Sequence, residues 1–380
     1  MTIDPQNLDS VLRALADAIH SEGPAVRFGT SPSGAADITT VDVDEFEDAA
    51  VVVSTSGSTG TPKETVLSVE ALAASSMATA MALQGEGQWL LALPLQYVAG
   101  VQVLVRSLFA GTRPWAMDLS GGFTPEAFTA AALELTDRTR FTSLVPTQLQ
   151  RLLEDPSPET LAVLRRFNAI LLGGAPAAPE LLAAAKDAGV NVVTTYGSAE
   201  TCGGCVYNGV PLEAVQVRIV EGKVQLGGDV IASGYLGQAE LSEAAFLSEG
   251  DTRWYLTNDL GALDVEGRLT VLGRADDVII SGGEKIAASV VAAQLEKVSG
   301  VSAAFVAGVP SAQWGQAVAA IVESSDPELD AEKVRAAVGT VLGHSTPKVI
   351  LVEAQLTRLA NGKVDRLTMI ERLAEVNQGK

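Results

Sequence analysis

The sequence STSGSTGTPK at residues 54–63 decides how the rest of this chain is interpreted. It follows AAVVV at residues 49–53, a short apolar run whose β-branched valines predict a buried strand. The stretch contains hydroxyl side chains, two glycines and one lysine, so one loop can offer backbone N–H groups, hydroxyl donors and a positive charge. Such groups bind phosphate. We therefore predict a phosphate-binding loop, and its predicted contacts are Ser54, Ser56, Gly57, Ser58, Thr59, Gly60 and Lys63.

The loop differs from the P-loop pattern G-x-x-x-x-G-K-[ST]. When the pattern is counted from Gly57, Pro62 stands at its second glycine and Glu64 stands at its Mg²⁺-binding hydroxyl. A P-loop NTPase is therefore disfavoured. A solvated Ser/Thr/Gly connector has a similar composition and stays an alternative for this window taken alone.

The composition predicts a globular protein of two domains. The chain has 380 residues, of which 47% are hydrophobic, and this is enough for a large core and more than one domain usually holds. The formal charge of −20 argues against nucleic acid or an anionic membrane as a partner. The first residues, MTIDP, lack the regions of a signal peptide, and no apolar run approaches the roughly 20 residues of a membrane span. We therefore expect a cytoplasmic protein.

The two cysteines, Cys202 and Cys205, are interpreted as structural or incidental thiols. A redox pair or half a zinc site would have the same C-x-x-C spacing. However, no second cysteine pair exists, and the only histidines, His20 and His344, lie far away in the sequence.

The order of apolar patterns predicts an α/β fold class. We expect a helix at residues 8–19, strands at 51–53, 89–93, 141–145, 169–172 and 192–195, and helices at 69–83, 98–109 and 179–188. This alternation predicts a large N-terminal domain, residues 1–274, with a mainly parallel sheet and a small β subdomain near residues 215–272. Residues 275–380 are expected to form a small α+β domain. A ligand site is expected at the carboxyl ends of the strands, where residues 54–63, 173–176 and 196–201 fall.

Further motifs follow the loop in order along the chain. They are PLQYVAG at residues 94–100, LGGAP at 172–176, TYGSAET at 195–201, YLTNDLG at 255–261, GRADD at 273–277, SGGEKI at 281–286 and ANGKVDR at 360–366. Together with the loop, this series resembles the adenylate-forming superfamily of acyl-CoA synthetases, nonribosomal-peptide adenylation domains and luciferases. The resemblance covers roughly residues 49–370.

The resemblance implies a role for individual residues. It implies that Glu200 binds Mg²⁺ and that Lys363 is the catalytic lysine of a mobile C-terminal domain, which turns about a hinge at Asp276. The remaining implied ATP contacts are Gly174, Ala175, Pro176, Tyr196, Gly197, Thr201, Asp259 and Arg274. The implied substrate-pocket residues are Tyr97, Gly100, Ser198 and Gly283, and Gly283 lies in the loop that serves the second half-reaction.

The sequence departs from the superfamily pattern at three positions. Tyr97 stands where a histidine is usual, Ala199 stands where a threonine binds the α-phosphate, and Asn258 replaces a turn glycine. Because alanine has no hydroxyl, Ser198 and Thr201 are the candidates to bind the α-phosphate in its place. Asn258 is expected to keep the turn, because asparagine tolerates left-handed backbone geometry.

Within the superfamily, the short length, SGGE at residues 281–284 and the sequence from Thr194 to Tyr207 resemble most the actinobacterial o-succinylbenzoate–CoA ligases of menaquinone biosynthesis. This implies ATP-dependent activation of the acid to an acyl adenylate and thioester formation with CoA, with ATP, Mg²⁺ and CoA as cofactors or co-substrates. Another aryl or acyl acid is the alternative substrate. A non-catalytic nucleotide-binding protein would be expected to lack Lys363 or Glu200, and a homodimer is an open expectation.

Overall fold

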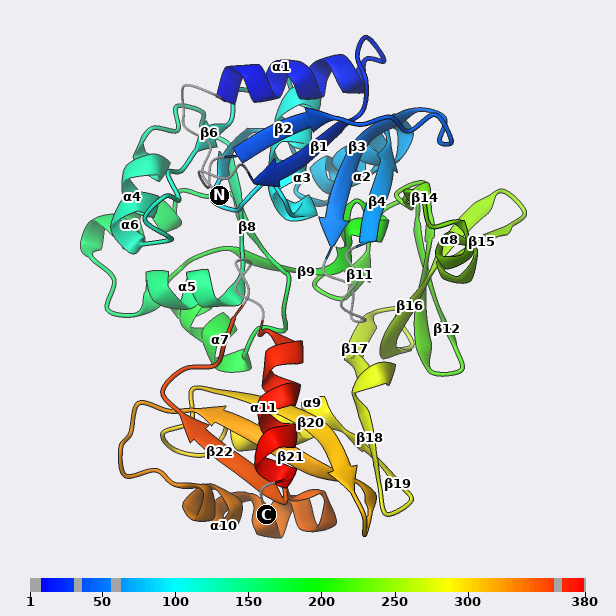
Figure 1. The fold of residues 1–380 in the computed structure, drawn as a ribbon. Helices are drawn as coiled ribbons and strands as arrows, with labels where there is room; N and C mark the ends of the chain where they lie inside the picture. Colours follow the sequence, from blue (N-terminus) through cyan, green and yellow to red (C-terminus); the bar gives the residue numbers. More distant parts are fainter. Residues whose placement is uncertain (1–7, 31–35, 56–62, 359–363, 379–380) are drawn as a thin grey trace. The chain divides into compact units, whose positions relative to one another are not determined.

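The computed structural model describes residues 8–30, 36–55, 63–358 and 364–378. The chain divides into two compact units, which are described separately. The first comprises Met1–Arg218, Gln225–Thr257 and Leu263–Leu269, and the second comprises Ile219–Val224, Asn258–Ala262 and Thr270–Lys380. Sheets and helices occur in both units, and this mixed architecture confirms the predicted fold class (Figure 1).

The first sheet of the first unit contains the strands on either side of the phosphate loop. Its order is β14-β4-β3-β1-β2, with β1 Val26–Thr30, β2 Ala36–Thr40, β3 Ala49–Thr55, β4 Lys63–Ser68 and β14 Gly234–Tyr235. Strand β3 is the predicted buried strand, and Ala50 to Val53 are at most 2% exposed. Its partner β4 runs antiparallel and pairs Lys63 with Thr55.

The strands beside the phosphate loop belong to a different sheet from the one predicted. Strand β3 is predicted as part of the mainly parallel sheet, but it lies in a separate sheet and pairs antiparallel with β4. The sequence of β4 begins with two charged residues, and its apolar part runs directly into the next helix. The local pattern therefore hides this strand, which forms because β3 and β14 pair with it on both sides.

The second sheet is the predicted mainly parallel sheet. Its order is β11-β10-β9-β8-β7-β5-β6, with β5 Gln88–Leu91, β6 Trp115–Ala116, β7 Arg140–Leu144, β8 Ala169–Leu172, β9 Val192–Ser198, β10 Gly203–Tyr207 and β11 Val210–Pro211. Strands β5 to β9 pair in parallel, and β10 and β11 are added antiparallel. Because β8 and β9 are parallel neighbours, the loops that follow them lie at the same edge.

Several helices of the first unit begin at a capping side chain or at a proline. They are α1 Leu8–Ile19, α2 Val69–Ala82, α3 Val98–Phe109, α4 Pro125–Leu133, α5 Pro146–Leu153, α6 Pro158–Leu164, α7 Pro179–Asp187, α8 Ala239–Ala245 and the short 3₁₀ turn η1 Ala199–Thr201. Ser68 caps α2 by accepting a hydrogen bond from the Ala71 N–H at 3.1 Å. Prolines stand in the first turn of α4 to α7, where a missing N–H costs nothing. A core around Phe128, Leu149 and Ile170 packs against the parallel sheet.

A third sheet has the order β12-β13-β16-β15, and β17 pairs with β16. Its strands are β12 Val215–Val220, β13 Lys223–Gly228, β15 Phe246–Glu249, β16 Thr252–Leu263 and β17 Leu269–Arg274. Asn258 and Asp259 lie within β16, so the turn predicted at Asn258 is wrong. The flanking residues are strong strand formers, and Trp254 and Thr257 are buried, so the extended conformation prevails over the turn preference of asparagine.

The second unit contains a small sheet with helices on both faces. Its elements are β18 Val278–Ser281, β19 Glu284–Ala287, β20 Ala303–Ser311, β21 Gly315–Glu323, β22 Val349–Glu353, α9 Ala288–Leu295, α10 Ala331–Leu342, α11 Arg366–Gln378 and the 3₁₀ turns η2 Ala275–Asp277 and η3 Gly343–Ser345. Alternate residues of β21 face opposite cores: Ala320 packs with α9 and α10, whereas Ile321 packs with α11. Both faces are therefore buried.

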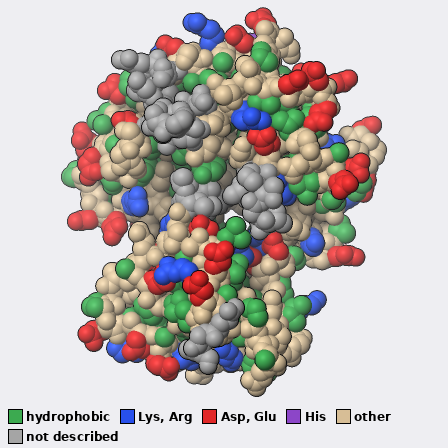
Figure 2. Space-filling view, viewed as in Figure 1, with side chains coloured by type: hydrophobic (Ala, Val, Ile, Leu, Met, Phe, Trp, Pro, Cys, Tyr) green, Lys and Arg blue, Asp and Glu red, His purple; other side chains and the backbone are tan. Residues whose placement is uncertain are grey.

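The surface reflects the acidic composition. Figure 2 shows acidic side chains spread over the visible face, and they do not gather in one patch. Within the described residues, no helix has the length and apolar character that crossing a membrane requires.

Candidate functional site

The strands beside the phosphate loop bring a group of charged residues together. Glu64 accepts a hydrogen bond from Arg27 Nη2 at 2.7 Å, and Ser54 Oγ lies 3.4 Å from its other oxygen. The Arg27 guanidinium offsets the negative charge of Glu64, so this carboxylate repels a bound phosphate less. Lys63 Nζ lies 4.9 Å from the centre of the Tyr235 ring. The predicted contacts Ser56, Gly57, Ser58, Thr59 and Gly60 lie outside the described residues.

Glu200 is a buried carboxylate at the end of β9. It lies in η1 and is 7% exposed. Its Oε1 accepts a hydrogen bond from the Tyr235 hydroxyl at 2.8 Å, and its backbone carbonyl accepts one from the Ala232 N–H at 2.9 Å. No cation of the described residues forms an ion pair with it. A buried carboxylate held on one oxygen can therefore offer the other to a cation.

The turn that carries Glu200 is fixed from several sides. The Ser198 N–H donates to Thr201 Oγ1 at 2.9 Å, and Thr201 Oγ1 donates to the Gly203 carbonyl at 2.7 Å. Thr201, a predicted nucleotide contact, therefore holds the turn through this hydroxyl. The buried Ser198 Oγ has no hydrogen-bond partner among the described residues, so it remains available for a ligand.

Two helices also hold this turn at Cys202, which adopts a left-handed conformation with φ of 50°. Its carbonyl accepts hydrogen bonds from Gln102 Nε2 of α3 at 2.6 Å and from Ser75 Oγ of α2 at 3.1 Å. The sequence motifs did not point to Gln102. The one feature of the sequence that could have indicated its role is that it is the single polar residue in the otherwise apolar helical sequence VAGVQVLV.

Both thiols are buried and free of disulfide bonds. Burial raises the pKa of the Cys205 thiol to about 12, and burial together with Cys205 raises the pKa of Cys202. Neither thiol is therefore ionised near neutral pH, which fits a structural role.

The predicted adenine-contacting residues follow β8. Gly174, Ala175 and Pro176 are exposed, and Tyr196 is partly buried on the neighbouring strand β9. Gly174 has φ of 84°, which favours glycine. Small exposed residues after one strand and an aromatic residue on the neighbouring strand are what a site for a flat base requires.

Gly197 marks a close approach between two strands. A Cβ atom at this position would lie 2.1 Å from the Gly203 carbonyl oxygen on β10. We expect Gly197→Ala to lower the free energy of unfolding by about 1–3 kcal/mol, because the strands must separate. Urea unfolding measures this change. Gly121→Ala, where an added Cβ meets nothing within 4 Å, is the control and should change stability less; equal effects would contradict the packing reason.

The predicted acid-pocket residues lie at the start of α3. Burial raises the pKa of the Tyr97 phenol, against the effect of a hydrogen bond with Gln96, so the hydroxyl keeps its proton. Gly100 is buried, and a Cβ there would lie 2.4 Å from the Pro94 carbonyl oxygen. The close approach of the α3 backbone to Pro94 therefore leaves no room for a side chain at Gly100.

The remaining predicted residues belong to the second unit. Arg274 Nη1 lies 3.6 Å from Asp259 Oδ1, which brings the two predicted ribose contacts together. Arg274 also binds both oxygens of Asp276, with Nη2 to Oδ2 at 2.7 Å. Burial raises the pKa of Asp276, but the hydrogen bonds and charge of Arg274 outweigh this effect and lower the pKa overall.

The other two predicted residues of this unit are Gly283 and Lys363. Gly283 has φ of 88° in the turn between β18 and β19, and Lys363 lies outside the described residues.

The donor set fits magnesium bound together with a nucleotide. Among the described residues, no group of three or more His, Cys, Asp or Glu side chains could hold a metal ion. A preformed cage is therefore absent from that part of the chain. Mg²⁺ usually binds through one or two carboxylates plus substrate phosphates and waters, and one buried carboxylate linked through Tyr235 to Lys63 meets this need.

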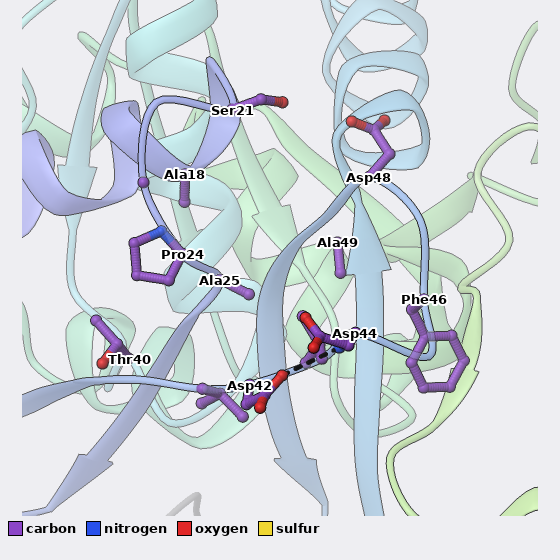
Figure 3. A pocket seen from close by; sticks show the side chains of 13 residues that line it. Ala18, Ser21, Pro24, Ala25, Thr40, Asp42, Asp44, Phe46, Asp48 and Ala49 are labelled. Carbon is purple, nitrogen blue, oxygen red and sulfur yellow. Dashed lines mark hydrogen bonds between the residues drawn. The ribbon is translucent and has the colours of Figure 1, made fainter.

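A hollow of about 640 Å³ lies elsewhere, between the end of α1 and the connection from β2 to β3. Figure 3 shows its lining, which includes Asp42, Asp44 and Asp48. The Asp44 N–H donates to Asp42 Oδ1 at 3.2 Å. Three carboxylates repel an anion, so this hollow is not a suitable site for ATP or an organic acid.

Comparison with known proteins places this geometry in a family. A family model described as AMP-binding enzyme matches residues 6–230. A probable 2-succinylbenzoate–CoA ligase of Mycobacterium tuberculosis is 41% identical over 334 residues, which cover 86% of this chain and 85% of that protein.

Solved structures of an o-succinylbenzoate CoA synthetase from Bacillus subtilis are also similar. One, in complex with the acyl-adenylate intermediate OSB-AMP, has a TM-score of 0.74 and 28% identity and covers 85% of this chain and 69% of that one. Another, in complex with ATP and magnesium ion, has a TM-score of 0.74 and 26% identity and covers 96% and 82% of the two chains. The chain belongs to the AMP-binding enzyme family and, within it, to the 2-succinylbenzoate–CoA ligases.

Proposed function

We propose that this chain is an AMP-forming acid–thiol ligase that joins 2-succinylbenzoate to CoA. ATP reacts with the acid to give an acyl adenylate and pyrophosphate, and the CoA thiol then displaces AMP to form the thioester. The observation that carries the proposal is the buried Glu200 carboxylate, which is linked through Tyr235 to the strand that begins at Lys63. Membership of the 2-succinylbenzoate–CoA ligases supports 2-succinylbenzoate, ATP and CoA as the substrates. A ligase for another aryl or acyl acid is the alternative.

The energetic purpose of the first step is to improve the electrophile. A carboxylate resists attack by a thiol because its carbonyl is electron-rich and its leaving group is poor. The acid oxygen attacks the α-phosphate of ATP, the bond to pyrophosphate breaks, and the resulting mixed anhydride carries AMP as a good leaving group. No external oxidant or reductant is needed.

The residues of this chain bind and orient the reactants in this proposal. Lys63 and the residues before it bind the phosphates, and Tyr196 and residues 174–176 bind the adenine. Asp259 and Arg274 bind the ribose. Glu200 would hold Mg²⁺, and the ion would neutralise phosphate charge when bound with ATP.

The proposal also includes the domain organisation. Residues 1–274 bind ATP and the acid, and residues 275–380 form the mobile domain with Lys363 and Gly283. Tyr97, Gly100 and Ser198 line the acid pocket. A cytoplasmic location and a homodimeric state remain predictions.

The test is an assay of both half-reactions with a panel of carboxylic acids. Purified protein is mixed with ATP, Mg²⁺ and each acid, and pyrophosphate exchange into ATP is measured. CoA is then added and the thioester is detected. We expect 2-succinylbenzoate to give the highest kcat/KM in both assays. A higher value for another acid would favour the alternative, and no exchange with any acid would reject the proposed function.

A further inference from the structure

Tyr235 is a buried tyrosine that touches both charged residues of the proposed ATP site. It is 1% exposed. Its hydroxyl donates to Glu200 Oε1 at 2.8 Å, and Lys63 Nζ lies 4.9 Å from its ring centre. One side chain therefore connects the proposed metal carboxylate with the lysine at the end of the phosphate loop. None of the motifs quoted above includes this residue.

The backbone around Tyr235 joins the two sheets that carry those groups. Strand β14 pairs antiparallel with β4, with Tyr235 opposite Thr65. The Leu236 N–H donates to the Glu64 carbonyl at 2.8 Å, and the Ala232 N–H donates to the Glu200 carbonyl at 2.9 Å. The segment 232–236 is thus hydrogen-bonded to the phosphate-loop strand and to the Glu200 turn, so it fixes the spacing between them.

The same segment is held rigidly by its other neighbours. Arg253 donates from Nε to the Ala232 carbonyl at 2.9 Å and from Nη2 to the Ser233 carbonyl at 2.6 Å. The Tyr235 ring lies 5.3 Å from the Phe246 ring, centre to centre. A ring confined in this way has little freedom to move its hydroxyl away from Glu200.

The Tyr235 hydroxyl is the donor in its contact with Glu200, and Oε1 of the carboxylate is the acceptor. The other carboxylate oxygen, Oε2, receives no hydrogen bond from the described residues.

We propose that Tyr235 is the positioning residue for Mg²⁺-ATP: it holds Oε1 of Glu200 so that the carboxylate keeps one orientation relative to Lys63 and strand β4. This inference rests on the proposed function and deepens it. Groups that orient a metal ligand by hydrogen bonding typically contribute 10–100-fold to metal affinity or activity. The effect of losing the hydroxyl should therefore appear in the magnesium requirement and not only in the rate.

The test is Tyr235→Phe, which keeps the ring and removes the hydroxyl. We expect the Mg²⁺ concentration for half-maximal pyrophosphate exchange to rise about 10–100-fold, with most of kcat recovered at saturating Mg²⁺. A second readout needs no turnover. Mn²⁺ binding in the presence of a non-hydrolysable ATP analogue is measured from the decrease of the free Mn²⁺ signal in electron paramagnetic resonance. This binding should weaken by a similar factor.

Tyr207→Phe is the matched control. Tyr207 is also buried, and its hydroxyl is hydrogen-bonded to Thr79 at 3.0 Å, with no bond to Glu200. Both variants should lose a comparable amount of thermal stability, but only Tyr235→Phe should change the Mg²⁺ and Mn²⁺ dependence. The inference is overturned if Tyr235→Phe leaves both dependences unchanged, if Tyr207→Phe changes them equally, or if the wild-type protein binds no Mn²⁺ with the analogue. If the wild-type protein binds Mn²⁺ and ATP but ligates no acid, the proposed function is rejected. The role of Tyr235 is then still decided by comparing the two variants.

Discussion

Lys363→Ala should lose about 10²–10³-fold in the rate of adenylate formation and retain much of the rate of thioester formation from supplied acyl adenylate. Negative charge develops on the transferring phosphoryl group only in the first step. A positioned ammonium stabilises this charge in a site that excludes water, much as an oxyanion-hole donor does. Pyrophosphate exchange measures the first step, and CoA consumption with synthetic acyl adenylate measures the second. The prediction rests on the motif ANGKVDR at residues 360–366.

The control for this variant is Lys348→Ala, an exposed lysine of the second unit that has no proposed catalytic role. It should leave both half-reactions within about two-fold, as expected for surface changes away from a site. If Lys363→Ala impairs both half-reactions equally while the protein stays folded, the lysine does not act selectively in adenylation. If it impairs neither, the role that the motif implies for this lysine is wrong.

Glu200→Gln should raise the magnesium requirement by about 100-fold or more and should lower turnover, with little loss of folding. The amide keeps the shape of the side chain, and its oxygen can still accept the hydrogen bond from Tyr235, which limits the cost of the substitution. However, a neutral amide lacks the charge that Mg²⁺ requires of a direct ligand. Magnesium titrations of pyrophosphate exchange, together with thermal unfolding, separate the two effects.

Glu180→Gln provides the charge-matched control, because Glu180 is exposed in the first turn of α7. It should leave the magnesium titration unchanged. Unchanged magnesium dependence in Glu200→Gln would show that the metal is held elsewhere. A large loss of stability without a change in the titration would instead assign Glu200 a structural role.

The parts of the fold that were predictable have strong local patterns. Helices α1 and α3 have the predicted bounds, because their apolar residues recur at helical spacing. Strand β8 is a short apolar run with turn residues on both sides, and it also has the predicted bounds. Glu200 and Gly174 could be singled out because motifs with fixed spacing carry them.

The features that were missed depend on contacts between distant parts of the chain. Strand β4 forms because β3 and β14 pair with it, and the register of Tyr235 with Thr65 has no local sequence signal. Gln102 and Tyr235 are single polar groups in apolar surroundings, and their importance depends on the partners that folding brings to them. A sequence interpreted in short windows cannot reveal such partners.

Because both cysteines are buried, dyes can be attached at chosen positions and the proposed domain movement can be followed by fluorescence. Because Cys202 and Cys205 are the only cysteines, and both are buried with raised pKa values, maleimide dyes should leave the native protein unlabelled. Met77→Cys on α2 and Val341→Cys on α10 would place reactive thiols at positions that are 66% and 68% exposed, one on each unit. Energy transfer between the two dyes could then follow the enzyme through successive additions of ATP, acid and CoA without removal of any native residue from its core.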